Sequence, residues 1–431
     1  MRPGKHGVLR VTSASQVFFG WRVVAAAFVL AIFGWGLGFY GTPIYLHAVR
    51  EARGWPVALV SAAVTVHFLF GAYVVANLPR LYRRFGIARV TRLGVIALAL
   101  GLVGWAAARE PWQLFLATLL SGGGWVTMGA AAINAIVAPW FVAGRPKALS
   151  TAYNGASVGG IIFAPLWVSL IAALGFPLAA ALVGGVSVIV VWVLVECVFR
   201  HTPASMGQEP DGGKGLPATT GVALAVVPAL PGAALWRDWR FRTLAAGMAL
   251  GLFAQIGLLA HLFSIIVPAL GAQNAGIVMG LATASAIVGR TGFGWLMPPG
   301  ADRRLVACAS YGVQIAGSLV LLLAGAENVP LIFVGVLLFG FGLGNATSLP
   351  PLIAQVEFAK EDTARAVSLI VAIGQASYAF APAVFGILRE LPTMLPAVAV
   401  PSTSVVFASA AVVQLAAIGA YLAGRGQRFA A

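Results

Sequence analysis

The chain of 431 residues is 60% hydrophobic and only 9% charged, a composition too apolar for a soluble globular protein. Its formal net charge is +15, but the basic residues lie in short segments between apolar runs. That pattern indicates a positive-inside membrane topology and excludes an extended nucleic-acid-binding surface. The two cysteines, Cys197 and Cys308, lie in hydrophobic segments and offer neither a disulfide framework nor metal-ligand spacing, so we interpret them as packing residues.

The first apolar run follows basic residues, as the hydrophobic region of a secretory signal does. It continues from about Phe18 to Leu46 without an early small-residue cleavage site, so we predict a retained first span. Runs of about 20 or more apolar residues predict twelve spans, which must be helical because a backbone in lipid has to satisfy its own hydrogen bonds. The predicted helices are 20–46, 56–79, 90–108, 112–140, 148–173, 176–199, 243–270, 272–297, 305–324, 330–356, 366–388 and 402–423.

The distribution of positive charge predicts which side of the membrane each loop faces. If both termini are cytoplasmic, four of the 27 Lys and Arg residues fall in outer loops, Arg290 falls within a span, and the other 22 fall in inner segments. The four outer residues are Arg50, Arg53, Arg109 and Arg389. Because positive loops are retained on the cytoplasmic side, we expect a multi-pass protein of the inner or plasma membrane with both termini in the cytoplasm.

A long polar interruption near the midpoint divides the chain into two halves. We predict an N-terminal six-helix bundle over 1–200, a cytoplasmic linker over 201–241 and a C-terminal six-helix bundle over 242–431. The linker is rich in Gly, Pro and charge. Its one apolar stretch is short and interrupted by Pro228 and Pro231, so we do not count it as a span.

The two halves carry a weak internal repeat at an offset of 218 residues. The matching positions are Trp21-Arg22 with Trp239-Arg240, Gly71 with Gly289, Gly122 and Gly124 with Gly340 and Gly342, and Ala148 and Ser150 with Ala366 and Ser368. Six helices repeated in parallel are typical of a two-bundle transporter whose site lies between the halves. The stretches SGGGW and FGFGLGN lack the Gly-Lys-Ser of a phosphate-binding loop, so we expect them to allow close packing and bending of the fourth and tenth helices.

The sequence resembles a major facilitator superfamily transporter over nearly the whole chain. Three segments resemble its monocarboxylate and oxalate/formate porter branch, namely FFGWRVVAAAF, RGWPVALVSAA and RPKALSTAYNGASVGGIIFAPL, at the first, second and fifth spans. The resemblance implies an all-α integral membrane fold, with twelve transmembrane helices in two six-helix bundles, and a transporter rather than an enzyme.

Arg290 is the only Lys or Arg well inside a predicted span, where a guanidinium is costly unless it faces a partner or a water-filled cavity. Members of the branch often carry an arginine after a glycine late in the eighth helix that binds the substrate carboxylate, and Gly289-Arg290 matches that position. The alternative is that Arg290 snorkels to the cytoplasmic end or caps helix carbonyls. Ala286 stands where many members carry an acid for proton coupling, and no acid lies at the middle of a span, so Arg290 argues for anion binding alone.

The loop between the second and third spans, PRLYRRFG, resembles the superfamily pattern Gly-x-x-x-Asp-Arg-x-Gly. It keeps Arg84 and Gly86 but has Arg83 where the family has aspartate. In the family this loop makes charge contacts that hold one face of the transporter closed. The resemblance therefore implies a gating loop whose acidic partner comes from elsewhere, with Asp302 or Asp238 as candidates.

Two histidines are candidate proton carriers. His261 in the seventh span and His67 in the second are lone polar residues in apolar segments. Each is either a proton carrier, since histidine titrates near neutral pH, or a neutral side chain bonded between helices. His261 is the stronger candidate because the first and seventh helices line the cavity in the transporters that the chain resembles.

Four further side chains are candidate substrate contacts beside Arg290 and His261. Tyr40 begins a Tyr-x-x-Pro pattern that resembles a substrate-contacting tyrosine of the branch. Asn154, Gln375 and Tyr378 lie at mid-span, where each either contacts a small ligand or bonds between helices.

We therefore predict a secondary transporter that moves a small organic anion, specifically a monocarboxylate, by alternating access, with Arg290 as the carboxylate anchor. The substrate gradient, a proton or a counter-anion would drive it, so it would be a symporter or an antiporter. Its expected partners are the lipid bilayer and the anion, without nucleic acid, and we expect a monomer. The alternatives are efflux of amphipathic or drug-like compounds and a membrane sensor that does not transport. We expect no cofactor and no metal site, because no catalytic or metal-ligand constellation rises above chance.

Overall fold

The computed structural model describes residues 18–142, 144–213, 230, 233–297, 301–325, 327–394 and 401–425. Within these ranges all regular structure is helical, and ten helical segments are long and apolar enough to cross a membrane. Two of the ten, Val57–Ala107 with 51 residues and Trp239–Phe293 with 55, are more than twice the length of about 20 residues that a crossing needs. Each reverses direction at a glycine, Gly86 with φ 77° or Gly271 with φ 73°, so the described residues make twelve crossings.

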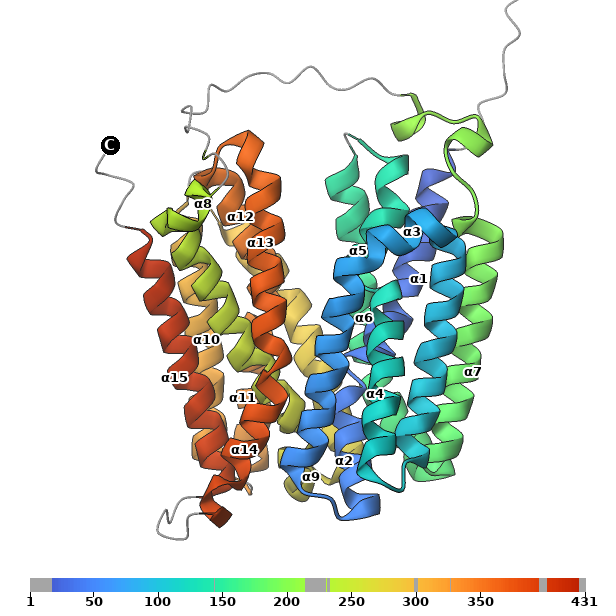
Figure 1. The fold of residues 1–431 in the computed structure, drawn as a ribbon. Coiled ribbons are helices and arrows are strands. Elements are labelled where there is room, and N and C mark those ends of the chain that lie inside the picture. The colour runs from blue at the N-terminus through green and yellow to red at the C-terminus, as the bar shows by residue number, and fades with distance from the viewer. Residues whose placement is uncertain are drawn as a thin grey trace, which may run out of the picture.

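The twelve crossings form two bundles that stand side by side (Figure 1). The N-terminal bundle contains α1 (Gly20–Gly38), α2 (Thr42–Arg53), α3 (Val57–Ala107), α4 (Pro111–Trp125), α5 (Ala130–Val137), α6 (Arg145–Leu174) and α7 (Phe176–Leu194). The C-terminal bundle contains α9 (Trp239–Leu296), α10 (Arg303–Ala324), α11 (Val329–Leu343), α12 (Asn345–Glu357), α13 (Lys360–Ala379), α14 (Ala381–Met394) and α15 (Ser402–Ala423), and the short α8 (Ala234–Arg237) precedes it. The predicted fold of twelve helices in two six-helix bundles is confirmed.

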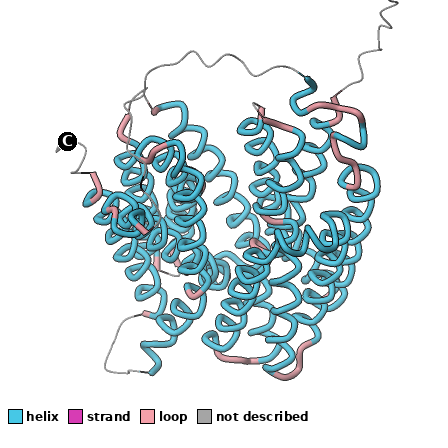
Figure 2. Tube along the Cα trace, turned by 45° about the horizontal axis from the view of Figure 1, so that its top comes forward, coloured by secondary structure: helices cyan, strands magenta, loops and turns pink. Residues whose placement is uncertain are grey.

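Four of the crossings are interrupted near their middle. The fourth breaks after Trp125 and the tenth at Gly344, where we predicted bending. The first breaks between Gly38 and Thr42 and the eleventh at Phe380, and both breaks interrupt segments that we predicted to be continuous. The tube in Figure 2 shows these interruptions as short departures from an otherwise helical trace.

The glycines of the internal repeat make equivalent contacts in the two bundles. A Cβ added to Gly122 or Gly124 would collide with the backbone of His67 in the second crossing or of Gly94 in the third. At the repeat positions, a Cβ on Gly340 or Gly342 would meet the backbone of Ala282 in the eighth crossing or of Ser310 in the ninth. The expectation that these stretches allow close packing is confirmed, and the same helix pairs approach in both halves.

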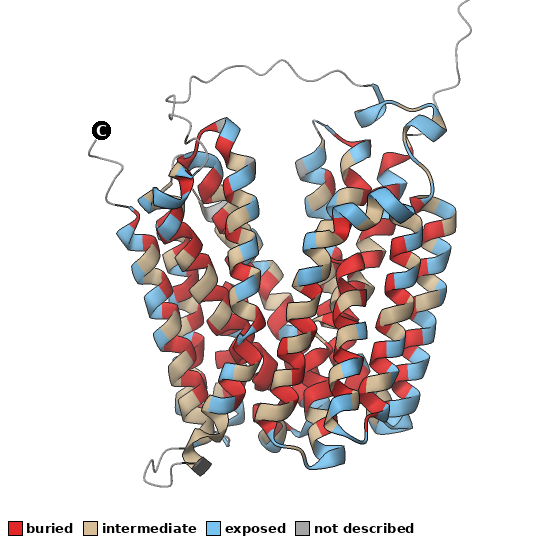
Figure 3. Cartoon of the chain, in the orientation of Figure 1, coloured by how far each residue is buried: buried red, intermediate tan, exposed pale blue. Residues whose placement is uncertain are grey.

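Among the described residues, the two bundles touch only toward one end of the molecule. We call the end that carries residues 201–213 and α8 the linker end, and the opposite end the distal end. Figures 1 and 2 show the bundles diverging toward the linker end, and Figure 3 shows buried residues gathered where they meet. Most contacts between the bundles join the distal parts of α6 and α9, and of α3 and α14, and others join α2 with α9 and α13 with α3.

Specific polar bonds support this distal contact. The Ser169 hydroxyl bonds Gln273 Oε1 at 3.1 Å, and the Ala383 N–H donates to Thr65 Oγ1 at 3.2 Å. Small residues let the helices approach: a Cβ on Gly276 would lie 2.9 Å from a Val168 methyl carbon. The described conformation is therefore closed at the distal end.

Candidate functional site

Arg290 reaches the middle of the tenth crossing because the eighth and tenth crossings pack through small residues. A Cβ on Gly289 would collide with the Phe341 carbonyl oxygen, and a Cβ on Gly344 would collide with the Ala286 carbonyl oxygen. This close approach brings the Arg290 Nε within 3.0 Å of the Gly344 carbonyl oxygen, to which it donates. Gly344 separates α11 from α12 at the middle of that crossing, so the guanidinium lies at mid-span.

The position of the Arg290 head group bears on its two predicted roles. Helical side chains lean toward the N-terminus of their helix, which for the eighth crossing is the distal end. The guanidinium therefore points away from the linker end, which argues against snorkelling there. It does bind one helix carbonyl, as the alternative role predicted. Its two terminal nitrogens have no hydrogen-bond partner among the described residues, which leaves donors for a ligand.

Tyr40 approaches Arg290 from the other bundle. It lies in the break between α1 and α2, close to Thr283 of α9. Tyr40 also lies within electrostatic range of Arg290. A Cβ on Gly160 of α6 would lie 2.8 Å from both the Tyr40 ring and the Thr283 hydroxyl, so the three meet at the boundary between bundles. Sequence reasoning missed Thr283, for which the only available signal was its position two helical turns before Arg290.

No carboxylate opposes Arg290 at this depth. All twelve Asp and Glu residues of the chain lie within the described ranges, and each lies at a helix end or in a connection. Ala286, one turn before the arginine, is buried against the tenth crossing. The charge at the middle of the boundary between bundles is therefore positive, which suits an anionic ligand.

Asn154 lies on the face of α6 that looks toward the C-terminal bundle. Ile161 and Pro165, seven and eleven residues further on, contact Gly280 and Gly276 of α9, and these spacings repeat one helical face. At Asn154 the bundles have diverged, and its side chain is exposed, as are Ser150 and Thr151. Polar side chains exposed within a span face water rather than lipid, so this face borders a water-accessible space.

Tyr378 belongs to an aromatic cluster that crosses between the bundles. Its ring lies 5.7 Å from that of Phe68, edge to face, and Phe68 in turn contacts Phe39 at 6.0 Å and Trp125 at 6.2 Å. Phe39 packs at 5.0 Å against Tyr40. The cluster thus connects Tyr378 to the Arg290 region. Sequence reasoning missed Phe39, Phe68 and Trp125, because aromatic residues in an apolar span carry no signal that distinguishes a site from lipid-facing or core positions.

Gln375, the other candidate on α13, is half-buried one turn before Tyr378, and the structure gives no contact for its side chain. Gly374 beside it packs against Leu252 and Met248 of α9. A substrate contact through Gln375 therefore stays a prediction.

His67 is held entirely within the N-terminal bundle. Its Nδ1 lies 2.9 Å from Ser121 Oγ, its Nε2 lies 2.9 Å from the Gly38 carbonyl oxygen, and its ring stacks on Trp125. Because a carbonyl only accepts, Nε2 carries the proton and Nδ1 faces the serine hydroxyl. Both ring nitrogens are satisfied in a neutral side chain, so the geometry favours the predicted interhelical role over proton transfer.

His261 differs from His67 in having one nitrogen without a partner. Its Nε2 donates to the Pro382 carbonyl at 3.0 Å, near the break of the eleventh crossing. Its Nδ1 is buried and has no hydrogen-bond partner among the described residues. The side chain is 0% exposed, so a proton could reach this nitrogen only after the surrounding helices move. Proton transfer by His261 therefore stays a prediction.

The predicted gating loop forms no ion pair with its candidate partners in this conformation. Arg84 is exposed beside the turn at Gly86, and its guanidinium lies over the Phe85 ring, 5.2 Å from its centre. Asp302 accepts from the backbone N–H of α10 and pairs with Arg425 at 2.7 Å. Asp238 likewise caps α9 and lies 3.5 Å from Arg240. Both acids thus serve the C-terminal bundle, and a lock through Arg84 stays a prediction for the state closed at the linker end.

Comparison with known proteins adds a family assignment. Residues 26–382 match the Major Facilitator Superfamily. The chain is similar to the MFS transporter asaE of Aspergillus flavus, with 26% identity over 358 residues that cover 79% of this chain and 74% of the relative. It is also similar to monocarboxylate transporter 11 of Mus musculus, with 27% identity over 293 residues that cover 65% of this chain and 60% of that protein.

Solved structures share the architecture. The nucleoside transporter NupG superimposes with a TM-score of 0.71 at 13% identity, covering 96% of this chain and 100% of that chain. A bacterial homologue of the human lysosomal transporter Spinster, inward-facing and unoccupied, gives a TM-score of 0.65 at 15% identity, covering 94% and 97%. At these identities the likeness shows the fold alone.

Proposed function

Because the chain belongs to the Major Facilitator Superfamily of membrane transporters, we propose that it carries a small organic anion, with monocarboxylates as the substrate class, by alternating access. The observation that carries the proposal is the mid-span Arg290, which is fixed at Nε by the Gly344 carbonyl. Its terminal nitrogens have no hydrogen-bond partner among the described residues. A planar guanidinium offers a carboxylate two parallel N–H donors, a geometry that an ammonium cannot reproduce.

The surroundings of Arg290 support the same substrate class. Tyr40 would add a hydroxyl donor from the opposite bundle, beside Thr283. The aromatic cluster around Phe68 and Tyr378 would contact the apolar part of a monocarboxylate. The similarity to a monocarboxylate transporter points the same way.

The proposed cycle uses the two bundles as rigid halves. Substrate would enter from the linker end, where the bundles diverge, and bind between Arg290 of one bundle and Tyr40 of the other. Closure of the linker end and separation of the distal contacts would then release it on the other side. We assign the linker end to the cytoplasm, because the topology predicted from the sequence assigns 22 of the 27 basic residues to the cytoplasmic side.

Uptake of labelled monocarboxylates by proteoliposomes tests the proposal. Removing a hydrogen bond to a charged group costs about 1.5–3 kcal/mol, so Arg290→Ala should lower transport efficiency roughly 10- to 100-fold. Arg290→Lys keeps the charge without the planar fork and should be intermediate. Tyr40→Phe removes a neutral donor and should cost roughly 3- to 10-fold.

Arg89→Gln is the matched control, since Arg89 is an exposed arginine at the start of the third crossing. Unchanged uptake in Arg290→Ala would refute the anchor role. Saturable transport of hydrophobic cations, without transport of carboxylates, would instead favour efflux of drug-like compounds through the aromatic cluster.

A further inference from the structure

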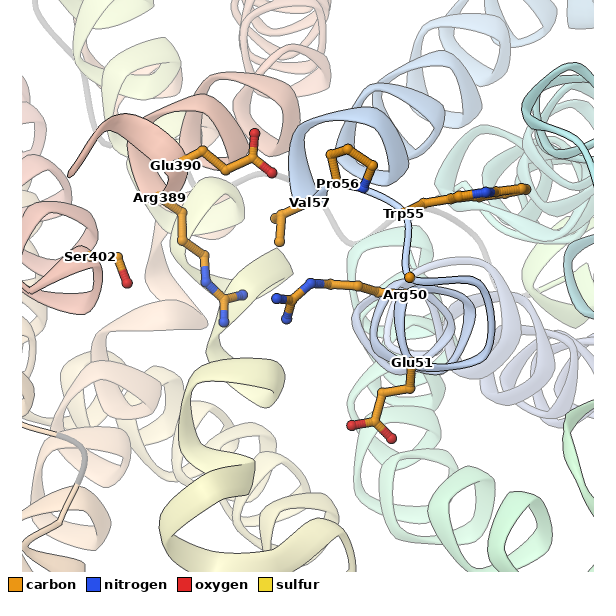
Figure 4. Close-up of a pocket in the computed structure, with 9 residues that line it drawn as sticks. Arg50, Glu51, Trp55, Pro56, Val57, Arg389, Glu390 and Ser402 are labelled. Atoms are coloured by element: carbon orange, nitrogen blue, oxygen red, sulfur yellow. The ribbon is translucent and has the colours of Figure 1, made fainter. Parts of the chain in front are cut away.

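A second feature at the boundary between the bundles lies far from Arg290, at the distal end. A pocket of about 610 Å³ opens there, within the size range of small-ligand sites. The N-terminal bundle contributes Arg50, Glu51, Gly54, Trp55, Pro56 and Val57, and the C-terminal bundle contributes Arg389, Glu390 and Ser402. Figure 4 shows these side chains around the space between the bundles.

Two guanidinium groups of the pocket face each other. Arg50 extends from the end of α2 and Arg389 from α14, and Figure 4 shows their head groups pointing toward one another across the boundary. Neither forms an ion pair with an acid within the described ranges. Within the described ranges, the Arg389 side chain forms one hydrogen bond, to Ser264 Oγ at 2.5 Å, and the Arg50 side chain forms none. Two like charges in this arrangement repel each other and weaken the contact between the bundles.

The two acidic residues of the pocket are engaged away from this pair. Glu51 points away from Arg389 in Figure 4, and it lies 3.7 Å from His47 of its own helix. Glu390 accepts a hydrogen bond of 3.1 Å from the Ala58 backbone N–H, at the N-terminus of α3. Glu390 therefore bridges the bundles beside the arginines without lying between them.

We propose that Arg50 and Arg389 form a second anion site, in which a carboxylate-sized anion bridges the two guanidinium groups. Each guanidinium can donate two parallel hydrogen bonds to a carboxylate, and a chloride ion would share the charge without that geometry. Because the arginines belong to different bundles, the site exists only while the distal end is closed. An anion bound there stabilises the distally closed state, and its departure favours opening.

The second site is independent of the proposed substrate site. Its residues lie at the distal ends of α2 and α14, whereas Arg290 bonds a carbonyl at the middle of the tenth crossing. The experiment therefore uses an Arg290→Gln background, in which anion binding at mid-span is disabled. A result at the distal site then does not depend on the substrate assignment.

Disulfide cross-linking across the distal contact measures closure. In a background with Cys197→Ser and Cys308→Ser, Val168→Cys and Gly276→Cys place thiols on residues that meet between the bundles. Acetate or chloride replaces a bulky sulfonate buffer anion at constant ionic strength, and the cross-linking rate is recorded. At ten times the Kd of the anion, the closed-to-open ratio should rise roughly tenfold.

Charge-removing variants at the pocket distinguish the site from a general salt effect. Arg50→Gln or Arg389→Gln should abolish the anion dependence and raise cross-linking without anion, because the repulsion is gone. Arg53→Gln removes an exposed charge from the same helix end, outside the pocket, and should behave as the parent. Thermal unfolding in the same titrations provides a second readout that needs no cysteines.

The outcomes separate the possible occupants and the failure of the proposal. A response to acetate but not to chloride assigns the site to carboxylates, whereas equal responses assign it to small anions in general. Anion dependence that persists in Arg50→Gln and Arg389→Gln would overturn the proposal. So would a parent protein whose cross-linking and thermal stability are both insensitive to acetate and chloride.

Discussion

Breaking the buried ion pair between Arg304 and Glu357 from one side should strongly destabilise the C-terminal bundle. Arg304 is 1% exposed, at the linker end of α10. Its Nε and one terminal nitrogen bond the two carboxylate oxygens of Glu357, each at 2.8 Å. The remaining N–H groups donate to Thr243 Oγ1 at 3.1 Å, to the Tyr421 carbonyl at 3.1 Å and to the Arg240 carbonyl at 2.8 Å. All five donors are thus satisfied, and four crossings are joined.

Glu357→Ala would leave the guanidinium buried with three neutral partners and no counter-charge. Breaking one side of a buried pair costs about 3–5 kcal/mol, so the free energy of unfolding should fall by that amount. Replacing both partners with apolar residues removes the buried charge as well. The double variant Arg304→Met/Glu357→Met should therefore be more stable than either single variant, with a coupling energy of about 2–3 kcal/mol.

Unfolding of the purified protein by SDS in mixed micelles, followed by tryptophan fluorescence, measures these differences. Glu361→Ala is the control, because Glu361 is an exposed acid four residues away at the start of α13. If Glu357→Ala unfolds at the same SDS fraction as Glu361→Ala, the pair contributes nothing and the reasoning fails. Additive effects in the double variant would also refute it.

Two further predictions concern the helix contacts and the histidines. The Cβ of Gly344→Ala would collide with the Ala286 carbonyl and displace the acceptor of Arg290, so both the stability of the protein and its affinity for substrate should fall. The control is Gly312→Ala, whose Cβ meets nothing within 4 Å and which should leave both unchanged or raise stability by up to about 1 kcal/mol. Equal behaviour of the two variants in binding and unfolding assays would contradict the packing argument. His67→Phe loses two hydrogen bonds and should lower the free energy of unfolding by about 1–3 kcal/mol, while uptake still responds to an imposed pH gradient. His261→Gln should remove that response of uptake to the pH gradient. A response that survives in His261→Gln would exclude this histidine as the proton carrier.

The number of crossings was predictable because hydrocarbon imposes a local rule on every span. A backbone in lipid must satisfy its own hydrogen bonds, so apolar length alone indicates a helix. The glycines of the repeat were also informative, since Gly122 and Gly340 approach equivalent neighbours in the two halves. The breaks near Phe39 and Phe380 were missed although Pro43 and Pro382 follow them closely, because proline is also tolerated inside continuous membrane helices, as at Pro165 and Pro268.

The candidate site was predictable in its charge but not in its contacts. Arg290 stood out because a mid-span guanidinium needs a partner, whereas its bond to Gly344 depends on how two distant helices pack. Arg50 and Arg389 appeared in the sequence only as charges of two separate outer loops. Their meeting depends on the register between bundles, and no spacing along the chain encodes that register.

The distal contacts are suited to repeated opening, and this links the fold to alternating access. They combine small residues, such as Gly276 against Val168, with hydrogen bonds between neutral groups, such as Ser169 with Gln273. Water can replace each neutral bond when the helices separate, so little free energy is lost per bond on opening. The facing charges of Arg50 and Arg389 oppose closure further, unless an anion lies between them. By contrast, the fully satisfied Arg304 network lies within one bundle, where it stabilises a half that moves as a unit. The Arg304 network thus holds the C-terminal bundle together, whereas most contacts between the bundles are weak or conditional.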